Sequence, residues 1–307
     1  MFWLLAALFF GQDLDSLKKQ FEYDTRAPLN AEERLMFERN GVRVYDLTFD
    51  SPLGGKVTAY LTVPAKPGKY AGVVFGHWGP GNRTEFLPEA QIYSRAGAVC
   101  VMIDYPWTRP APWWSSADDI TESEKALKLQ AQAVIDLRRA IDLLLSRGDV
   151  NGARLGYAGH SYGAQFGAIL AAVDRRLRTA VLIGGIPDLE AILLEGSNPG
   201  LAGYRNIIGE DKIREALAKH RSMAAIEYVP HAAPVPLLFQ FARHELNFGV
   251  PAMERYGRAA SEPKRILWYD TGHELNDPRA LADRARWLAE KLKLNGIESA
   301  LRGAIRP

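Results

Sequence analysis

A five-residue motif near the middle of the chain constrains the fold more than any other feature. A short apolar run ends in Gly159-His160-Ser161-Tyr162-Gly163, and a stretch rich in alanine and glycine with helical spacing follows. This order predicts a strand, a sharp turn and a helix, with the serine at the turn. A turn this tight strains the serine backbone and requires small neighbours, which Gly159 and Gly163 supply. The side-chain oxygen of Ser161 would then project from the end of a sheet, beside the N–H of Tyr162 in the first turn of the helix.

The chain around this motif predicts a mostly parallel sheet. Residues 42–49 and 56–64 alternate apolar and polar side chains on either side of a turn, which predicts an antiparallel hairpin. The later apolar runs are continuous, and such runs indicate strands that are buried on both faces. They occupy residues 71–77, 96–104, the segment that ends at Ser161, 179–183, 235–241 and 265–269, with helical spacing at 122–147, after Ser161 and at 278–294. We therefore expect one α/β domain with an eight-stranded sheet and helices on both faces.

Two segments fall outside this alternation. Residues 187–230 hold helical stretches and a loop between two strands. We expect them to form a small cap insertion over the carboxyl edge of the sheet, where open α/β sheets bind ligands. Residues 12–41 are polar with apolar side chains at intervals, from Leu14 to Phe37. We expect a helical leader there, packed on the domain that residues 42–307 form.

The first eleven residues are strongly apolar. They resemble the apolar region of a secretory signal peptide with cleavage near Gly11, although a basic start and an A-x-A site are missing. We expect export to the periplasm or the medium. The alternative is an apolar segment that packs on the domain of a cytoplasmic protein. The run is too short to span a bilayer and no longer one follows, so no stable membrane span is expected.

Charge and cysteine content exclude several classes of function. The formal net charge is +2 over 307 residues, which gives no electrostatic case for binding nucleic acid or an anionic membrane. The single cysteine, Cys100, excludes an intrachain disulfide and a cysteine-based metal cluster. The sequence also lacks the common motifs for zinc, phosphate and dinucleotide binding. We therefore expect no metal and no organic cofactor.

A histidine and an acid stand where a serine nucleophile on such a sheet would need them. His273 lies in the loop after the last strand, where a base can reach the serine. Glu245 lies in the loop after the preceding strand, and its task would be to hold the imidazole in one tautomer. The chain order of serine, acid and histidine is the one that this kind of sheet uses. Asp270 is the rival acid, only three residues before His273, and we place His244 near the site without a catalytic role.

Two further loops belong at the same edge of the sheet. After residues 71–77, the backbone N–H of Trp78 or Gly79 can point into the site and form an oxyanion hole with the N–H of Tyr162. The loop after residues 96–104 carries several prolines and three tryptophans, which are Trp107, Trp113 and Trp114. These rings can form an aromatic wall for a substrate, including the sugar ring of an acylated carbohydrate. The alternative is a wall that packs only against the cap.

Residues 42–295 resemble the α/β-hydrolases, and most closely the dienelactone-hydrolase-like and prolyl-oligopeptidase-like serine hydrolases. The resemblance rests on residues 77–81, residues 159–163, the loop at Glu245 and the pair Gly272-His273. It implies the strand order 1-2-4-3-5-6-7-8, with the first pair antiparallel. Three positions depart from the family pattern: Glu245 where Asp is usual, Ala242 where Gly is frequent, and Ser161 where dienelactone hydrolases proper use cysteine. The serine argues for ester chemistry and against a dienelactone substrate.

Together the motifs and the resemblance predict a carboxylesterase-like serine hydrolase that needs no cofactor. It would cleave a small-molecule ester in two steps through an acyl-enzyme on Ser161. A peptidase of the prolyl-oligopeptidase type is one alternative, although a short leader stands where those enzymes carry a propeller. A non-catalytic binding protein with this fold is the other, and such a protein would have no need of Ser161, Glu245 and His273 together.

Overall fold

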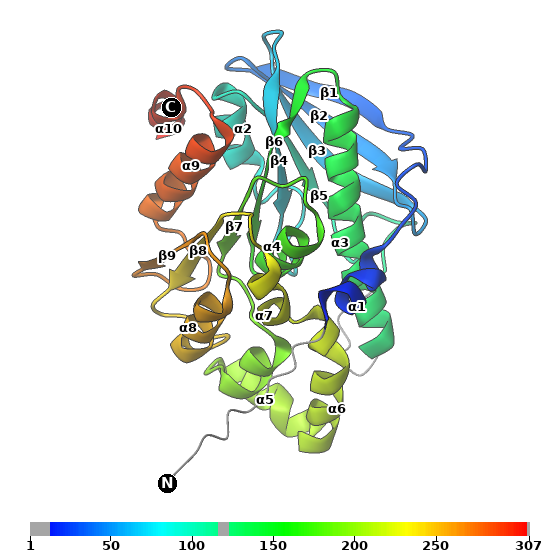
Figure 1. Ribbon diagram of the computed structural model, residues 1–307, viewed down its shortest axis with the longest axis vertical. Helices are drawn as coiled ribbons and strands as arrows, with labels where there is room; N and C mark the ends of the chain where they lie inside the picture. Colours follow the sequence, from blue (N-terminus) through cyan, green and yellow to red (C-terminus); the bar gives the residue numbers. More distant parts are fainter. Residues whose placement is uncertain (1–12, 116–122, 306–307) are drawn as a thin grey trace.

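A computed structural model describes residues 13–115 and 123–305, and its centre is a nine-stranded sheet (Figure 1). The strand order is β1-β2-β3-β5-β4-β6-β7-β8-β9. β1, β2 and β3 are antiparallel to their neighbours, whereas β4 to β9 run parallel. The strands are β1 (Glu32–Arg39), β2 (Val42–Asp50), β3 (Lys56–Pro64), β4 (Tyr70–Gly76), β5 (Ala98–Ile103), β6 (Val150–His160), β7 (Thr179–Ile183), β8 (Leu237–Ala242) and β9 (Lys264–Tyr269).

The continuous apolar runs form the middle of this sheet, as expected. Every residue of β5, β7 and β8 is buried, because helices cover both faces of these strands. In β2, buried positions recur at intervals along the strand, which fits its place near the sheet edge. With β1 set aside, the strand order is the one that the family resemblance implies. The prediction of a mostly parallel α/β sheet with helices on both faces is therefore confirmed, with nine strands in place of eight.

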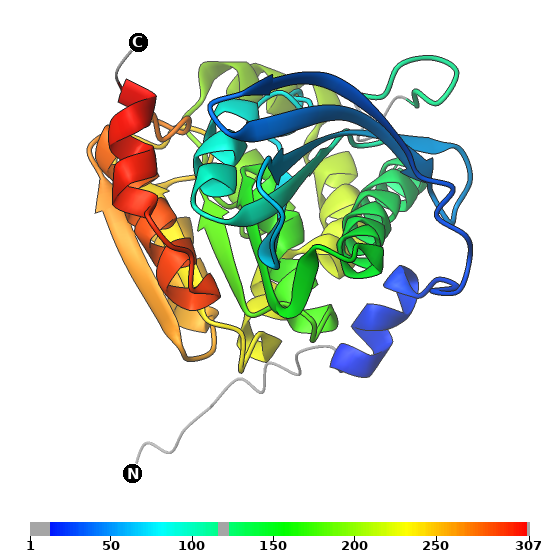
Figure 2. The same cartoon turned by 90° about the horizontal axis from the view of Figure 1, so that it is seen from above.

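The helices divide into two layers, each with its own hydrophobic core. One layer contains α3 (Ser123–Ser146), α4 (Tyr162–Val173) and α8 (Val250–Ala259). The other contains α2 (Leu87–Arg95), α9 (Pro278–Leu292) and α10 (Ile297–Ile305). Seen from above, α9 and α10 lie on one side of the sheet and α3 on the other (Figure 2). This arrangement buries the central strands and leaves their carboxyl ends as the place where loops can build a site.

The leader differs from its prediction in its second half. Residues 14–21 are helical, as α1 (Leu14–Lys18) and a 3₁₀ turn (Lys19–Phe21), but residues 32–39 form β1 and not a helix. β1 is an edge strand with all eight residues exposed, so it lacks the burial period that marks a strand. Its hydrogen bonds to β2 determine its structure. The local signal for this hairpin is Asn40-Gly41, where both residues have positive φ, of 52° and 74°.

Between β7 and β8 the chain forms a group of helices beyond the carboxyl ends of the strands, at the bottom of Figure 1. They are a π-helical turn (Ala191–Glu195), α5 (Pro199–Ile208), α6 (Glu210–His220), a 3₁₀ turn (Arg221–Met223), α7 (Ala225–Tyr228) and a second 3₁₀ turn (Val229–His231). We refer to residues 187–231 as the cap. The leader contacts the cap, because Gln20 Nε2 donates to the carbonyl of Ser222 at 2.9 Å and to the hydroxyl of Tyr228 at 3.1 Å.

The expected signal peptide, residues 1–11, lies outside the described residues. Within residues 13–115 and 123–305, no helix combines the length and the apolar composition that crossing a bilayer demands.

Candidate active site

Ser161 occupies the sharp turn between β6 and α4. Its backbone has φ 56° and ψ −112°, a conformation that is strained for any residue with a side chain. The surroundings hold it there, since the Ser161 N–H donates to the carbonyl of Ile183 at 2.8 Å. Gly159 and Gly163 are required beside it: a Cβ on Gly159 would collide with the backbone of Gly163, and a Cβ on Gly163 with the carbonyl of Gly76. The turn leaves the Ser161 side chain at the carboxyl end of the sheet, as predicted.

The structure brings Ser161, His273 and Glu245 into one hydrogen-bonded chain. His273 Nε2 lies 2.9 Å from Ser161 Oγ, and His273 Nδ1 lies 2.6 Å from Glu245 Oε2. Because Nδ1 faces a carboxylate, it carries the proton, and Nε2 is the acceptor of the serine O–H. The Glu245 side chain is fully buried, and its other oxygen accepts the N–H of Asn247 at 2.8 Å. Phe248 packs edge-on against the His273 ring, with 5.5 Å between ring centroids.

The rival acid lies elsewhere. Asp270 has a side chain that is 67% exposed, and it pairs with Arg243 at 3.2 Å. His244 is an exposed loop residue whose N–H donates to the carbonyl of Thr271. Neither residue takes part in the chain of hydrogen bonds that contains Ser161. Among the described residues, no group of His, Cys, Asp and Glu side chains is arranged to hold a metal ion.

The loop after β4 approaches the elbow closely. The N–H of Gly163 donates to the carbonyl of His77 at 3.1 Å, and a Cβ on Gly79 would stand 3.0 Å from the Tyr162 ring. Trp78 and Gly79 are the two candidates for a second oxyanion donor. The backbone N–H of Trp78 donates a hydrogen bond to Glu85 Oε2 at 2.8 Å. Gly79 is held through its carbonyl, which accepts from Trp107 Nε1 at 2.8 Å. The backbone of Gly79 therefore lies against the elbow, while Trp78 turns its N–H to an acid.

The buried side chain of His77 connects this loop to the loop after β5. Its Nδ1 donates to the carbonyl of Trp78 at 2.5 Å, and its Nε2 accepts the N–H of Tyr105 at 3.2 Å. The residue is 2% exposed, and its ring packs against the Tyr105 ring at a centroid distance of 3.9 Å with the planes tilted by 36°. Burial lowers the pKa of His77 to about 4, so the ring is neutral at neutral pH. A neutral ring is also the only form that can accept from Tyr105 while donating to Trp78.

A second pair of residues, not singled out from the sequence, connects the loops around Ser161. Glu85 Oε1 lies 2.7 Å from His160 Nδ1, and His160 Nε2 lies 3.0 Å from the carbonyl of His273. Glu85 thereby contacts both the Trp78 loop and the residue before the serine. The position of His160 in the motif, directly before Ser161, is the one local signal that it would lie near the base loop.

The three tryptophans have different surroundings. Trp107 packs near Tyr162, with 6.2 Å between the ring centroids, and is the one that the structure brings to the elbow. Trp113 lies against Gly55 at the turn between β2 and β3, and Trp114 is 56% exposed. The loop that carries them is fixed by a buried ion pair between Arg109 and Asp136 of α3.

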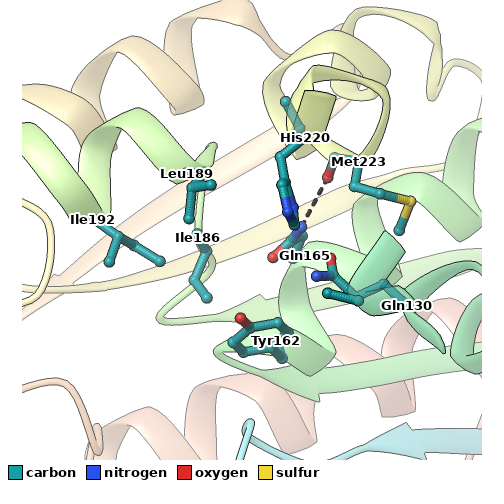
Figure 3. Close-up of a pocket in the computed structure, with 10 residues that line it drawn as sticks. Gln130, Tyr162, Gln165, Ile186, Leu189, Ile192, His220 and Met223 are labelled. Atoms are coloured by element: carbon teal, nitrogen blue, oxygen red, sulfur yellow. Dashed lines mark hydrogen bonds between the residues drawn. The ribbon is translucent and has the colours of Figure 1, made fainter. Parts of the chain in front are cut away.

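A cavity of about 180 Å³ lies beside the elbow, between α3, α4 and the cap (Figure 3). Tyr162, the residue after Ser161, forms part of its wall, and Gln165 lies one turn further along α4. A cap over a ligand-binding edge was expected, but the lining of this cavity could not be predicted, because its walls come from segments far apart in the chain. They are Ala126, Gln130, Tyr162, Gln165, Ile186, Leu189, Ile192, His220, Met223 and Ala224.

Comparison with known proteins places the fold. No protein-family model matches the chain, and no curated protein matches its sequence. Many solved structures do match. An acetyl xylan esterase from Paenibacillus sp. R4 is similar with a TM-score of 0.75 at 18% identity, over 91% of this chain and 93% of that one. Acetyl Xylan Esterase 1 from Thermoanaerobacterium sp. JW/SL YS485 is similar with a TM-score of 0.76 at 16% identity, over 92% and 94%.

A third match is a cold-adapted esterase from an Arctic intertidal metagenomic library, with a TM-score of 0.61 at 15% identity, over 86% of this chain and 99% of that one. Identities this low establish a shared fold and leave the activity to be argued from the site. The strand order, the serine at the elbow and these similarities agree with the family resemblance seen in the sequence. The chain has the α/β-hydrolase fold.

Proposed function

We propose that the protein is a serine hydrolase that cleaves carboxylic esters of small molecules through an acyl-enzyme on Ser161. The observation that carries the proposal is the hydrogen-bonded chain from Ser161 Oγ through His273 to Glu245, with distances of 2.9 and 2.6 Å. A buried carboxylate, an imidazole and a serine hydroxyl in this order are the groups that acyl transfer requires. Three of the similar structures are esterases, which supports an ester as the substrate.

The mechanism follows from the position of each proton. His273 Nε2 takes the proton of Ser161 as Oγ attacks the ester carbonyl, and Glu245 stabilises the imidazolium that forms. The N–H groups of Tyr162 and Gly79 would donate to the oxyanion, each contributing about 3 kcal/mol to the transition state. His273 then protonates the leaving alcohol. In the second half-reaction, water attacks the acyl-enzyme with His273 again as base, and Ser161 is regenerated.

Hydrolysis of p-nitrophenyl acetate and butyrate tests the proposal. We expect Ser161→Ala to lower kcat by about 10⁴-fold or more, and Glu245→Gln by about 10³–10⁴-fold because the tautomer is no longer held. Asp270→Asn is the matched control, since it removes the rival acid and should leave turnover unchanged. Equal losses from Glu245→Gln and Asp270→Asn would contradict the assignment of the acid.

The same assay separates the alternatives. Aminoacyl p-nitroanilides report peptidase activity, and labelling by a fluorophosphonate reports a reactive serine. Labelling with no turnover of any short ester would show that the serine is activated but that the substrate is not an ester of this class. Absence of labelling would favour a binding protein with this fold. We also propose that residues 1–11 direct export. Fractionation of the cells followed by N-terminal sequencing tests this: a protein outside the cytoplasm that is cleaved near Gly11 is expected, and a cytoplasmic protein with an intact Met1 contradicts it.

A further inference from the structure

The cavity beside the elbow has the size and composition of a pocket for one ring. Its volume is about 180 Å³, somewhat larger than the roughly 150 Å³ apolar cavity that is known to hold a benzene molecule. Apolar side chains form part of the wall: Ile186 lies just before the cap, and Leu189, Ile192 and Met223 lie within it. Figure 3 shows these side chains around an open space above Tyr162. Gln130, Tyr162, Gln165 and His220 add polar groups to the wall. Apolar side chains combined with a few placed polar groups are the usual lining of a small-molecule site.

One polar atom in this wall has no partner. His220 is the last residue of α6 and is 8% exposed, and its Nε2 is buried without a hydrogen-bond partner among the described residues. In Figure 3 its ring reaches down from the cap toward Gln165. The side-chain amide of Gln165 is already engaged, because its Nε2 donates to the carbonyl of Met223 at 2.8 Å. Buried polar atoms are nearly always paired, so an unpaired one requires an explanation. Because this one lies in the wall of a cavity, a ligand in the cavity can supply its partner.

The charge of the cavity limits what that ligand can be. None of the described residues that line it carries a formal charge at neutral pH, since burial also lowers the pKa of His220. A charged group placed there would lose its hydration without gaining an ionic partner, so the ligand group is neutral. A neutral imidazole nitrogen is either a donor or an acceptor, according to its tautomer. A hydroxyl can serve as the partner of either form.

We propose that this cavity binds a hydroxyl-bearing ring of the substrate, with the ring against the apolar wall and the hydroxyl on His220 Nε2. The assignment rests on the proposed function for its link to catalysis, because Tyr162 joins the cavity wall to Ser161. It narrows the substrate class to neutral esters that carry a phenol-like group in the acyl or the alcohol part. A site built to hydrogen-bond a substrate hydroxyl discriminates against the analogue that lacks it, since the buried nitrogen is then left unpaired.

Binding to the cavity can be tested apart from catalysis. The probes are p-cresol and toluene, which differ by one hydroxyl, and the protein is the full chain with Ser161→Ala. We expect p-cresol to bind about tenfold more tightly than toluene in titrations followed by NMR, the factor of one good hydrogen bond. Equal binding of the two probes, or binding of neither, would overturn the proposal whatever the enzyme hydrolyses.

Variants of His220 test whether this residue causes the preference for p-cresol over toluene. His220→Leu should reduce the preference for p-cresol to about one, and His220→Gln should keep part of it because the amide can still pair with the hydroxyl. Lys219→Ala is the matched control on the same helix, since that side chain is 45% exposed and pairs with Glu215. A preference that persists in a folded His220→Leu protein would show that another group binds the hydroxyl. If His220→Leu does not fold, His220→Gln is the test: its preference for p-cresol should be smaller than that of the protein with His220, and an unchanged preference would overturn the assignment.

Matched esters distinguish the two halves of the substrate. For the acyl part, the pair is methyl 3-(4-hydroxyphenyl)propanoate and methyl 3-phenylpropanoate. For the alcohol part, it is 2-(4-hydroxyphenyl)ethyl acetate and 2-phenylethyl acetate. We expect one pair to show a preference of about tenfold in kcat/KM for the hydroxylated ester, lost in His220→Leu. No preference in either pair, in an enzyme that hydrolyses p-nitrophenyl acetate, would refute the cavity as a substrate pocket while leaving the proposed function intact.

Discussion

Acid should destabilise this protein through His77, and the size of the effect can be worked out. The ring's pKa is lowered from 6.5 to about 4 by burial. As the pH falls below 6.5, the unfolded chain takes up a proton that the folded ring refuses, so stability is lost between pH 6.5 and pH 4 and is fully present above that window. Applying the two pKa values at pH 5 gives a loss of about 2 kcal/mol relative to pH 7.5. The final loss below pH 4 is about 3 kcal/mol.

Urea denaturation of wild type and His77→Asn at pH 7.5 and pH 5 measures this effect. The variant should be less stable than wild type at pH 7.5, because it loses ring packing and a partner for the Tyr105 N–H. Between the two pH values, however, it should lose about 2 kcal/mol less than wild type, since it has no ring to protonate. Carboxylates that titrate in the same range affect both proteins and cancel in the difference. Equal losses in the two proteins would refute the argument that His77 is held neutral by its surroundings.

Three further outcomes test the scaffold of the site. Gly163→Ala should cost at least about 2 kcal/mol of stability, because its Cβ would collide with the backbone of β4, whereas Gly203→Ala, with open space around it, should cost nothing; thermal melts compare them. Arg109→Met should cost about 3–5 kcal/mol in urea denaturation by leaving Asp136 charged and buried, and adding Asp136→Leu should restore most of the loss. Glu85→Gln should cost about 1.5–3 kcal/mol by weakening two hydrogen bonds to a charged group, and wild-type stability would contradict that role.

The elements that could be predicted are those with local signals. The parallel strands follow from continuous apolar runs, and the elbow from two glycines around Ser161. His273 and Glu245 could be placed because each lies in the loop directly after a recognisable strand, and the ends of parallel strands meet at one edge. The outer strand β1 has no such signal in its side chains, since all eight residues are exposed. The one local signal for β1 is the turn pair Asn40-Gly41, which is typical of a β-hairpin and which the prediction of a helical leader did not take into account.

The remaining parts of the site depend on contacts between distant segments. Glu85 and His160 are 75 residues apart, and nothing in either local sequence pairs them. His220 is the last residue of an amphipathic helix, and nothing in that helix marks it as a site residue. Its proposed role depends on a cavity whose other lining residues lie as far away in the chain as Ala126. Three tryptophans in one short loop appeared equivalent, yet the backbone path separates Trp107 from the other two. Such distinctions arise from tertiary packing, which no local pattern records.

The contact between leader and cap bears on the order in which the chain can fold. Gln20 and Ser222 are 202 residues apart, and their hydrogen bond joins the 3₁₀ turn after α1 to the segment beside Met223 in the cavity wall. A ribosome must therefore release more than two thirds of the chain before this contact can form. The rest of the leader can pair earlier, because the carbonyls of Phe21 and Ala27 accept hydrogen bonds from α3. The central strands can associate earlier, because their contacts close shorter loops. The contact between leader and cap can thus form once β2 to β7 are available, whereas β8 and β9 follow Ser222 in the chain and complete the sheet later.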